Sequence, residues 1–388
     1  MNDEVTLTPK GQRWYRSGHP WVYRDDLKSA LPSLSGQIVR VKSSNGQLLG
    51  QAFYNAASKI ALRRLTDDPG EPIDRAFWER RLLCALELRK RLVSDSSAYR
   101  LISSEADGFP GLIVDRYDSV LVLQSLSLGI DRILPLIVEL LSERLQPQAF
   151  VARNDSSVRT LEGLPLEKRL LAGSRPDRTE VREGDRRYLV DVWEGHKTGA
   201  YLDQRENRLL SRRFSKGRVL DAFAYQGAFS LQVAAQADEV LAIEDSESVL
   251  MGFKENLNLN RITNVQVERD NAFDRLRALD RAGEKFDLVI LDPPAFARNK
   301  NEVPDAHRGY REINLRALKL LKPGGILISC SCSYNVSDEI FLAILQEASR
   351  DAKRPVHLLE IRTQSKDHPI LLTHPESKYL KCLILEAA

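Results

Sequence analysis

From about residue 200 to the C-terminus, short apolar runs alternate with segments that have helical periodicity. The runs occupy residues 218–223, 239–244, 265–268, 286–292 and 325–329. Apolar strands separated by helices are typical of a parallel sheet that helices cover on both faces. This part of the chain is therefore predicted to adopt a doubly wound, Rossmann-like α/β fold, and residues 356–360 and 379–385 are expected to close its sheet as a hairpin.

The chain before this region has a different texture. Residues 5–75 are short alternating runs broken by turn signals such as Asn45-Gly46, which are typical of a small β-rich domain. Residues 74–93 have helical spacing, and the apolar runs at 111–115 and 120–124 predict a hairpin. We therefore predict a β-rich domain at 1–75, a small α+β domain at 76–187 and the Rossmann-like domain at 188–388.

Length and composition narrow the class of protein. A chain of 388 residues is too long for one ordinary core. No apolar stretch approaches the roughly 20 residues that span a bilayer, and the acidic start at residues 1–4 carries no secretory signal, so we expect a cytoplasmic protein without a membrane partner. The net charge of +3 permits nucleic-acid binding without demonstrating it. Four cysteines and six scattered histidines show neither a disulfide framework nor metal-site spacing, so no metal is expected.

Polar residues and one glycine lie at or just after the ends of three successive predicted strands, at the edge where an open parallel sheet binds its ligands. These residues are Asp221, Tyr225, Gly227, Glu244, Asp270 and Asn271. Glu244 ends the second strand, where an acid can accept hydrogen bonds from two ribose hydroxyls. Asp270 or Asn271 follows the third strand and can bond an adenine amino group. The turn at Gly227 lacks the Gly-x-Gly-x-x-Gly spacing of a dinucleotide site, so NAD is disfavoured.

The fourth strand runs into Asp292-Pro293-Pro294-Ala-Phe296. Two prolines can continue neither a strand ladder nor a helix, so the chain must turn here with an acid at its mouth. A plain strand-ending turn is one interpretation. The other is that this turn resembles the base-contacting turn of nucleic-acid methyltransferases, with Pro293, Pro294 and Phe296 facing the substrate.

The fifth strand runs into Ser329-Cys330-Ser331-Cys332-Ser333. Carbon 5 of cytosine is too weak a nucleophile to accept a methyl group unaided, but a thiolate that adds at carbon 6 activates it. An acid at ring nitrogen 3, such as Asp292, would stabilise the charge that develops there. The alternative is that these cysteines are small buried apolar side chains, which is the usual environment of a free cysteine.

Across nearly its whole length the chain resembles the RlmI-type family of bacterial 23S ribosomal RNA cytosine-5 methyltransferases. The matching stretches are His19-Pro-Trp-Val-Tyr23, Asp107-Gly-Phe-Pro-Gly-Leu-Ile-Val-Asp115, Gly195-His-Lys-Thr-Gly-Ala-Tyr-Leu-Asp-Gln-Arg205, Leu291-Asp-Pro-Pro-Ala-Phe296, Arg308-Gly-Tyr-Arg-Glu-Ile-Asn314 and Ser331-Cys-Ser333. The resemblance implies an N-terminal PUA RNA-binding domain, a central α+β domain and a class I methyltransferase domain that uses S-adenosylmethionine. It also implies that 23S rRNA, or a large-subunit assembly intermediate, is the partner.

By the same resemblance, Cys332 is the nucleophile, and Cys330 stands where the family has another residue. Glu244 replaces the usual Asp, and Asn271 stands where an Asp is common. Ala295 lies where related two-cysteine enzymes carry the cysteine that assists product release, so release would need another base.

The resemblance adds two further groups of residues. Lys197, Thr198, Tyr201 and Gln204 precede the first strand of the sheet and would fold over the methionine end of the cofactor. Lys10, Arg13, Arg16 and Arg24 would form a phosphate-facing patch in the PUA domain.

Two other functions stay open at this point: a guanine or adenine N-methyltransferase, for which Cys332 would be dispensable, and an RNA-binding assembly factor without turnover. The target nucleotide and the oligomeric state, a homodimer included, are also open.

Overall fold

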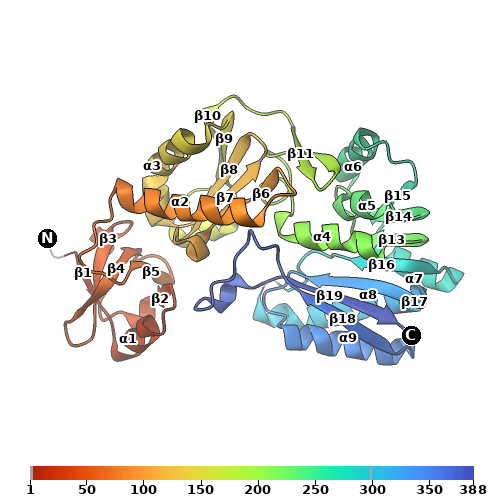
Figure 1. Ribbon diagram of the computed structural model, residues 1–388. Helices are drawn as coiled ribbons and strands as arrows, with labels where there is room; N and C mark the ends of the chain where they lie inside the picture. Colours follow the sequence, from red (N-terminus) through yellow and green to blue (C-terminus); the bar gives the residue numbers. More distant parts are fainter. Residues whose placement is uncertain (1–2, 298) are drawn as a thin grey trace. The chain divides into compact units, whose positions relative to one another are not determined.

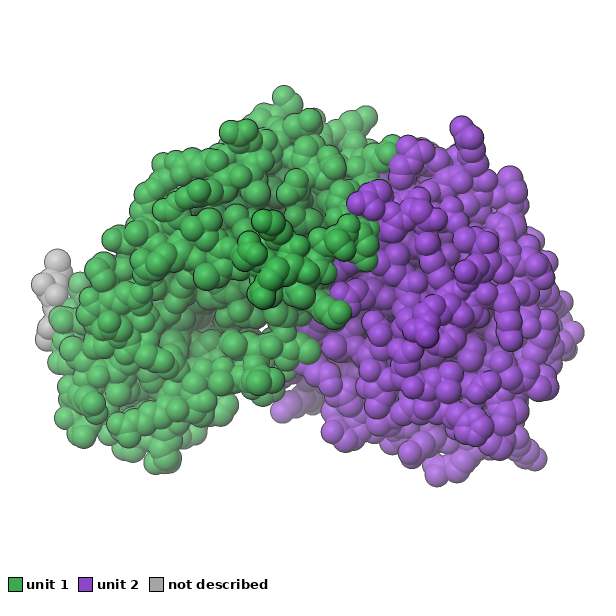
Figure 2. Space-filling view, viewed as in Figure 1, with its two compact units in different colours: residues 1–181, 190–202, 366–377 green, residues 182–189, 203–365, 378–388 purple. Residues whose placement is uncertain are grey.

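The structure, a computed structural model, describes residues 3–297 and 299–388 of the chain (Figure 1). The first two residues of the acidic start considered above, Met1 and Asn2, lie outside this part. The chain divides into two compact units that are each built from separate stretches of sequence (Figure 2). Unit 1 contains the chain up to Val181 with Val190–Leu202 and Lys366–Ser377, and unit 2 contains Arg182–Leu189, Asp203–Ser365 and Lys378–Ala388. The predicted domain boundaries near 75 and 187 stay a prediction.

The first sheet of unit 1 is five-stranded, in the order β1-β3-β4-β5-β2. Its strands are β1 (Glu4–Thr6), β2 (Trp21–Tyr23), β3 (Ile38–Lys42), β4 (Leu48–Tyr54) and β5 (Ile60–Thr66), joined by α1 (Pro9–Arg16), η1 (Arg24–Asp26) and η2 (Pro32–Leu34). The short alternating runs predicted within residues 5–75 include β3 and β4, which pair antiparallel on either side of the turn at Asn45-Gly46.

The second sheet of unit 1 has the order β10-β9-β8-β7-β6. Its elements are α2 (Arg75–Leu92), β6 (Ala98–Ser103), η3 (Ser104–Asp107), β7 (Leu112–Tyr117), β8 (Val120–Ser125), α3 (Leu128–Leu145), β9 (Ala149–Asn154), η4 (Ser157–Glu162) and β10 (Glu167–Gly173). The predicted helix at 74–93 is confirmed as α2, which begins where the Asp74 carboxylate accepts a hydrogen bond from the Phe77 backbone N–H. The predicted hairpin is confirmed as the antiparallel pair β7 and β8. A separate two-stranded sheet follows, formed by β11 (Thr179–Glu183) and β12 (Arg186–Val190).

Unit 2 is built on a seven-stranded sheet in the order β15-β14-β13-β16-β17-β19-β18. The strands are β13 (Arg218–Ala222), β14 (Glu239–Glu244), β15 (Val265–Arg269), β16 (Phe286–Leu291), β17 (Leu321–Ser331), β18 (Val356–Arg362) and β19 (Lys381–Ala387). Strands β13 to β17 pair in parallel, and β19 runs antiparallel between β17 and β18, which confirms the closing hairpin. The chain adds strands toward one edge of the sheet from β13 to β15 and toward the other edge from β16 onward. A ligand site is therefore expected at the carboxyl ends of β13 and β16, where this direction reverses.

Helices cover both faces of this sheet, as the strand and helix alternation predicts (Figure 1). They are α4 (Arg205–Ser211), α5 (Ala228–Val233), α6 (Glu247–Leu259), α7 (Ala272–Ala282), α8 (Val303–Leu320) and α9 (Asp338–Ala352), and the short turns η5 (Leu202–Gln204), η6 (Arg212–Phe214) and η7 (Lys300–Glu302) belong to the same part of the chain. The remaining short turn, η8 (Pro375–Ser377), belongs to unit 1. One apolar layer contains Leu276, Tyr310 and Phe341 from α7, α8 and α9, and the other contains Phe229 and Val233 from α5. In the part of the chain that the structure describes, no helix is long and apolar enough to cross a membrane.

Candidate active site

Three acids lie side by side at the carboxyl edge of the sheet in unit 2. Asp221 is near the end of β13, Glu244 ends β14, and Asp292 follows β16 directly. Both β14 and β16 are hydrogen-bonded to β13, and the negative charges of Asp292 and Glu244 both act on Asp221. The strand reversal therefore brings these three predicted residues together.

Asp221 is buried and only partly satisfied. Its Oδ2 accepts a hydrogen bond of 2.6 Å from the Ser230 hydroxyl, and its Oδ1 has no partner among the described residues. Burial is the main reason that the pKa of Asp221 rises to about 7, and the charges of Asp292 and Glu244 raise it further. A buried carboxyl oxygen without a partner is costly, so a polar group of a bound ligand would satisfy it.

We expect Asp221→Asn to flatten the pH dependence of stability. Because the folded pKa is raised, the folded protein keeps a proton that the unfolded chain releases above about pH 4, so the free energy of unfolding falls as pH rises toward 7. Urea unfolding measures this difference without the cofactor. Between pH 5 and pH 8, the free energy of unfolding of the wild type should fall by up to about 3 kcal/mol more than that of the variant. Equal losses would contradict the raised pKa.

The turn after β13 is held in an unusual backbone conformation. Phe223, Tyr225 and Gly227 have φ of 71°, 49° and 80°, in the left-handed region. A Cβ at Gly227 would also overlap the ring of Phe253 in α6. This combination of positive φ and close approach explains why glycine stands at the start of α5.

Gly227→Ala should therefore lower the free energy of unfolding by more than an alanine does at a position with a similar positive φ and no close neighbour. Gly283 is a matched control, because its φ is 73° and a Cβ there would meet nothing within 4 Å. We expect Gly283→Ala to cost about 1–2 kcal/mol, and Gly227→Ala about 1–3 kcal/mol more. Thermal unfolding of the two variants measures the difference, and equal losses would show that the Phe253 contact is unimportant.

Glu244 is fixed by two backbone N–H groups. Its carboxylate oxygens accept hydrogen bonds of 2.9 Å from Tyr225 and from Ser246, and burial raises its pKa. Beyond it, the Asn271 side chain accepts from the Phe273 N–H at 3.0 Å and caps α7, while Asp270 is exposed. Tyr225 therefore helps to hold the Glu244 carboxylate through its backbone N–H, and Asn271 stabilises the start of α7.

The Asp-Pro-Pro turn is anchored from two sides. Gln204 is buried, and its Nε2 donates to Asp292 Oδ1 at 2.8 Å. Pro293 is buried and Pro294 is exposed. The Phe296 ring packs between the rings of Phe273 and Tyr310, with centroid distances of 5.7 and 4.6 Å, so it ties the turn to α7 and α8.

Cys330 and Cys332 have different environments. The predicted strand at 325–329 extends to Ser331, so Cys330 belongs to β17, where it lies opposite Cys382 of β19 in an apolar layer of the core. The contact with Cys382 and burial raise the pKa of Cys330 well above its usual value. Cys332 comes just after the strand and is half-buried, with its Sγ 3.9 Å from the Pro293 carbonyl oxygen.

Three residues that sequence reasoning missed hold the Cys332 segment in place. The Ser333 hydroxyl lies 2.9 Å from the Tyr310 hydroxyl and accepts from the Ala297 N–H at 3.2 Å, which joins this segment to the Asp-Pro-Pro turn. Buried Lys381 donates to the backbone carbonyl oxygens of Ser333 at 2.7 Å and Tyr379 at 2.9 Å. A lysine at a strand start gives no sequence signal for this role, since such residues are usually solvated.

The other predicted residues lie in unit 1. The Thr198 hydroxyl donates to Asp115 at 2.6 Å and is 2.8 Å from the Tyr117 hydroxyl. Lys197 lies over the Tyr201 ring, with its Nζ 4.6 Å from the centroid. The four basic residues predicted to form a patch are exposed on α1 and η1: Lys10, Arg13, Arg16 and Arg24. Lys10 is paired with Asp26 at 3.1 Å.

Comparison with known proteins identifies the family to which the chain belongs. The family profile of S-adenosylmethionine-dependent methyltransferases matches residues 148–383, and that of PUA-like domains matches residues 5–67. The Ribosomal RNA large subunit methyltransferase I of Yersinia pseudotuberculosis serotype O:1b is 39% identical over 371 residues, covering 94% of each chain. The chain belongs to the ribosomal RNA large subunit methyltransferase I family. The predicted order of a PUA-like domain before a Rossmann-like methyltransferase fold is confirmed.

Two solved structures show the same fold as this member of the methyltransferase I family. A provisionally assigned methyltransferase, SMU.776, solved with S-adenosylhomocysteine, has a TM-score of 0.85 at 20% identity and 99% coverage of both chains. A protein assigned as a SAM-dependent methyltransferase from Streptococcus mutans has a TM-score of 0.83 at the same identity and coverage. S-adenosylmethionine is therefore the cofactor, as predicted. The partner-free oxygen of Asp221 and the fixed carboxylate of Glu244 fit such a polar nucleoside.

Proposed function

We propose that this methyltransferase modifies carbon 5 of a cytosine in 23S rRNA through a covalent adduct with Cys332. The observation that carries the proposal is the place of this thiol. It lies at the carboxyl edge of the sheet, half-buried, with its Sγ 3.9 Å from the carbonyl oxygen of Pro293. An acid and a thiol from adjacent strand ends are the two groups that activation of cytosine requires.

Cys332 and Asp292 have separate roles in the proposed methyl transfer. The Cys332 thiolate adds to carbon 6 of the base, which makes carbon 5 nucleophilic, and Asp292 hydrogen-bonds ring nitrogen 3 as charge develops there. When bound, S-adenosylmethionine would supply the electrophilic methyl group, with S-adenosylhomocysteine as the leaving group. A base then removes the proton from carbon 5, and the bond between carbon 6 and sulfur breaks to return the thiolate.

Ribosomal RNA is the proposed substrate because the relatives that are 39% identical are named as methyltransferases of large-subunit ribosomal RNA. A PUA-like match at residues 5–67 and the exposed side chains of Lys10, Arg13, Arg16 and Arg24 agree with an RNA partner. At the turn, exposed Pro294 is the substrate-facing residue, beside Pro293 and Phe296. We place the RNA-binding domain at 1–75 and a central domain at 76–187.

The cofactor is proposed to lie along the acidic edge of the sheet. The residues assigned to it are Asp221, Tyr225, Gly227, Glu244, Asp270, Asn271, Asp292, Lys197, Thr198, Tyr201 and Gln204. Glu244 accepts the ribose hydroxyls, because its carboxylate is held at the end of β14 by two N–H groups. Asp270 and Asn271 then face the adenine, since β15 is the next strand along the edge.

Lys381 is proposed as a positioning residue for the nucleophile. Burial lowers its pKa to about 8, and the charge of a Cys332 thiolate opposes this shift, so a cationic Lys381 favours the thiolate in turn. We expect Lys381→Met to slow iodoacetamide alkylation of Cys332 at pH 7 about tenfold and to move its pH profile upward, with an unchanged plateau. Lys381→Arg should retain most of the rate.

Lys378→Met is the matched control for this prediction. Lys378 pairs with Asp338 at 2.6 Å and is partly exposed, and its charge acts on Lys381, so its loss should change the alkylation of Cys332 much less than Lys381→Met does. If Lys381→Met lowered only the plateau, the lysine would control access to the thiol rather than its ionisation.

Bisulfite sequencing of rRNA from a deletion strain tests the proposed function. One 5-methylcytosine should disappear from 23S rRNA and return when the wild-type protein is supplied. An unchanged map, with loss of a methylated guanine or adenine instead, would replace the proposal with N-methylation.

A further inference from the structure

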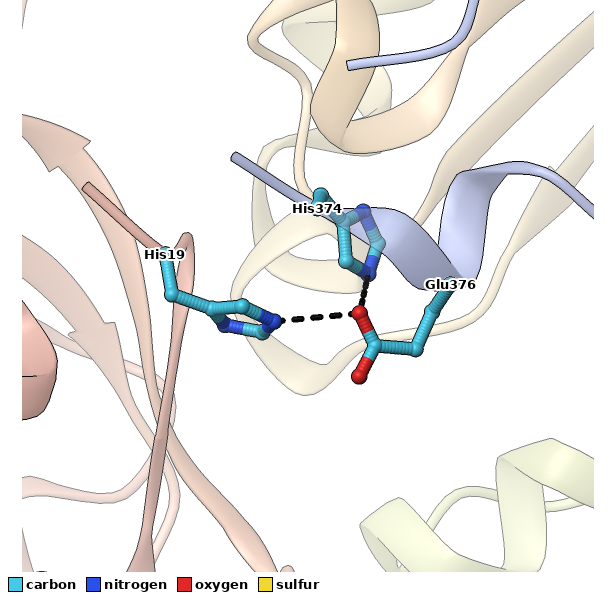
Figure 3. A group of neighbouring side chains, drawn as sticks. All are labelled: His19, His374 and Glu376. Carbon is cyan, nitrogen blue, oxygen red and sulfur yellow. Dashed lines mark hydrogen bonds and ion pairs between the residues drawn. The ribbon is translucent and has the colours of Figure 1, made fainter. Parts of the chain in front are cut away.

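Three potential metal ligands meet in unit 1, far from one another in the sequence. His19 precedes β2, whereas His374 and Glu376 belong to the segment Lys366–Ser377, and Figure 3 shows all three side chains pointing toward one another. The Nε2 atoms of His19 and His374 lie 3.1 and 3.7 Å from the same oxygen, Oε2 of Glu376. All three ligand atoms lie within 4.8 Å of one another.

The burial of these groups distinguishes them from an ordinary surface cluster. His19 and His374 are 3% and 4% exposed, and Glu376 is half-buried. Neither ring nitrogen of His374 has a hydrogen-bond partner among residues 3–297 and 299–388. An imidazole buried without a partner is costly, and a bound cation at its Nε2 would remove part of that cost.

The spacing of the ligand atoms fits a small cation. Zinc holds nitrogen and oxygen ligands at about 2.0–2.1 Å, which places neighbouring ligand atoms of a tetrahedron about 3.4 Å apart. The distances of 3.1 and 3.7 Å lie on either side of this value. The two Nε2 atoms lie within 4.8 Å of each other, so side-chain adjustments that close this separation would bring the three atoms to a common centre.

The surroundings of the cluster also suit a metal ion. The Trp14 ring is 4.6 Å from His19 and the Trp21 ring is 4.3 Å from His374, so aromatic rings shield the imidazoles. The nearby cation Arg63 is already paired with Glu105 at 2.9 Å, and also with Glu162. Its charge is therefore largely neutralised within unit 1.

Metal binding would change which ring nitrogen of His19 carries the proton. His19 Nδ1 lies 3.1 Å from the Trp21 N–H and 3.4 Å from the Trp21 carbonyl oxygen. Without a metal, Nδ1 accepts from the N–H, and the proton on Nε2 is donated to Glu376. A metal ion on Nε2 would take the place of that proton, and Nδ1 would then carry a proton for the Trp21 carbonyl oxygen, as ligating histidines commonly do, and give up the hydrogen bond from the Trp21 N–H.

We propose that His19, His374 and Glu376 bind one zinc ion, with a fourth position left for a water molecule. Two imidazoles and one carboxylate are ligands that zinc prefers. The ion would tie the segment Lys366–Ser377 to the N-terminal sheet of the same unit. Because it involves none of the residues assigned to methyl transfer, this site can be tested independently of the proposed function.

The test uses the full chain without an affinity tag, stripped with EDTA and titrated with zinc in a calorimeter. We expect one equivalent to bind, and His374→Ala or Glu376→Gln to weaken binding about 100-fold or more. His357→Ala is the matched control, since His357 is exposed on β18, and it should leave the affinity unchanged. Absence of stoichiometric binding, or equal binding by all variants, would overturn the proposal.

Cobalt substitution of the wild-type protein keeps the test valid if a variant fails to fold. Cobalt in the proposed site should show the visible bands of a four-coordinate ion without a thiolate charge-transfer band in the near ultraviolet. A thiolate band would place the metal at a cysteine such as exposed Cys84, and would also overturn the proposal.

Discussion

Cys332→Ala is expected to abolish methyl transfer, lowering kcat by about 10⁴-fold or more, as removal of other covalent nucleophiles does. The thiol lies outside the apolar core, so its loss should change the free energy of unfolding little. S-adenosylmethionine should still bind within a few-fold of the wild-type affinity in calorimetry. Single-turnover transfer of a labelled methyl group to unmodified 23S rRNA measures the effect.

Cys330→Ala is the matched control for this variant. Cys330 is fully buried between core residues, so its truncation should cost about 1 kcal/mol of stability and leave turnover nearly intact. If Cys330→Ala were inactive while Cys332→Ala retained turnover, the assignment of the nucleophile would be reversed.

Asp292→Asn is expected to have the second largest effect, a loss of about 10²–10³ in kcat. The asparagine keeps an oxygen that can accept from Gln204 Nε2, so the turn should stay in place, but it cannot supply a carboxyl group to ring nitrogen 3. The variant should bind S-adenosylmethionine and RNA with changes much smaller than the loss in kcat. Rapid-quench measurement of the methylation step separates a slower chemical step from weaker binding.

Gln204→Ala provides the comparison for Asp292. It removes the hydrogen bond of 2.8 Å to Asp292 without removing the acid, so it should reduce kcat less than Asp292→Asn does. A loss in Asp292→Asn that appeared only in cofactor affinity would assign Asp292 to cofactor binding alone.

The architecture could be predicted from the sequence because its signals are local. Apolar runs and turn residues predicted the five parallel strands, the closing pair β18 and β19, and the hairpin β7 and β8. Helical spacing over residues 74–93 predicted α2 in the same way. The presence and type of each strand or helix depend mainly on residues nearby in the sequence, whereas the pairing of β18 with β19 joins residues such as Val356 and Ala387 that are farther apart.

The environments of the two cysteines could not be predicted in this way. The end of β17 depends on its pairing with β19, where Ser331 lies opposite Lys381, and on the hydrogen bonds that Ser333 makes to Tyr310 and Ala297. These contacts join residues more than 20 positions apart. A pattern of alternating serine and cysteine alone could not show that Cys330 is in the core.

The histidine and glutamate cluster was missed for a similar physical reason. His19 and Glu376 are separated by 357 positions, and they meet only because the segment Lys366–Ser377 returns to the first unit of the fold. Metal sites are usually recognised in a sequence by closely spaced ligands, and the two ligands in the C-terminal segment are too few to form that signal.

Trapping of the covalent adduct tests the central claim most directly. An RNA substrate with 5-fluorocytidine at the target position cannot release a proton from carbon 5, so the adduct should accumulate when S-adenosylmethionine is present. We predict that mass spectrometry of the digested complex will show the methylated base joined to the peptide that contains Cys332, and that Cys332→Ala will form no adduct. Methylation of the normal substrate without any adduct, or an adduct at another residue, would contradict the account.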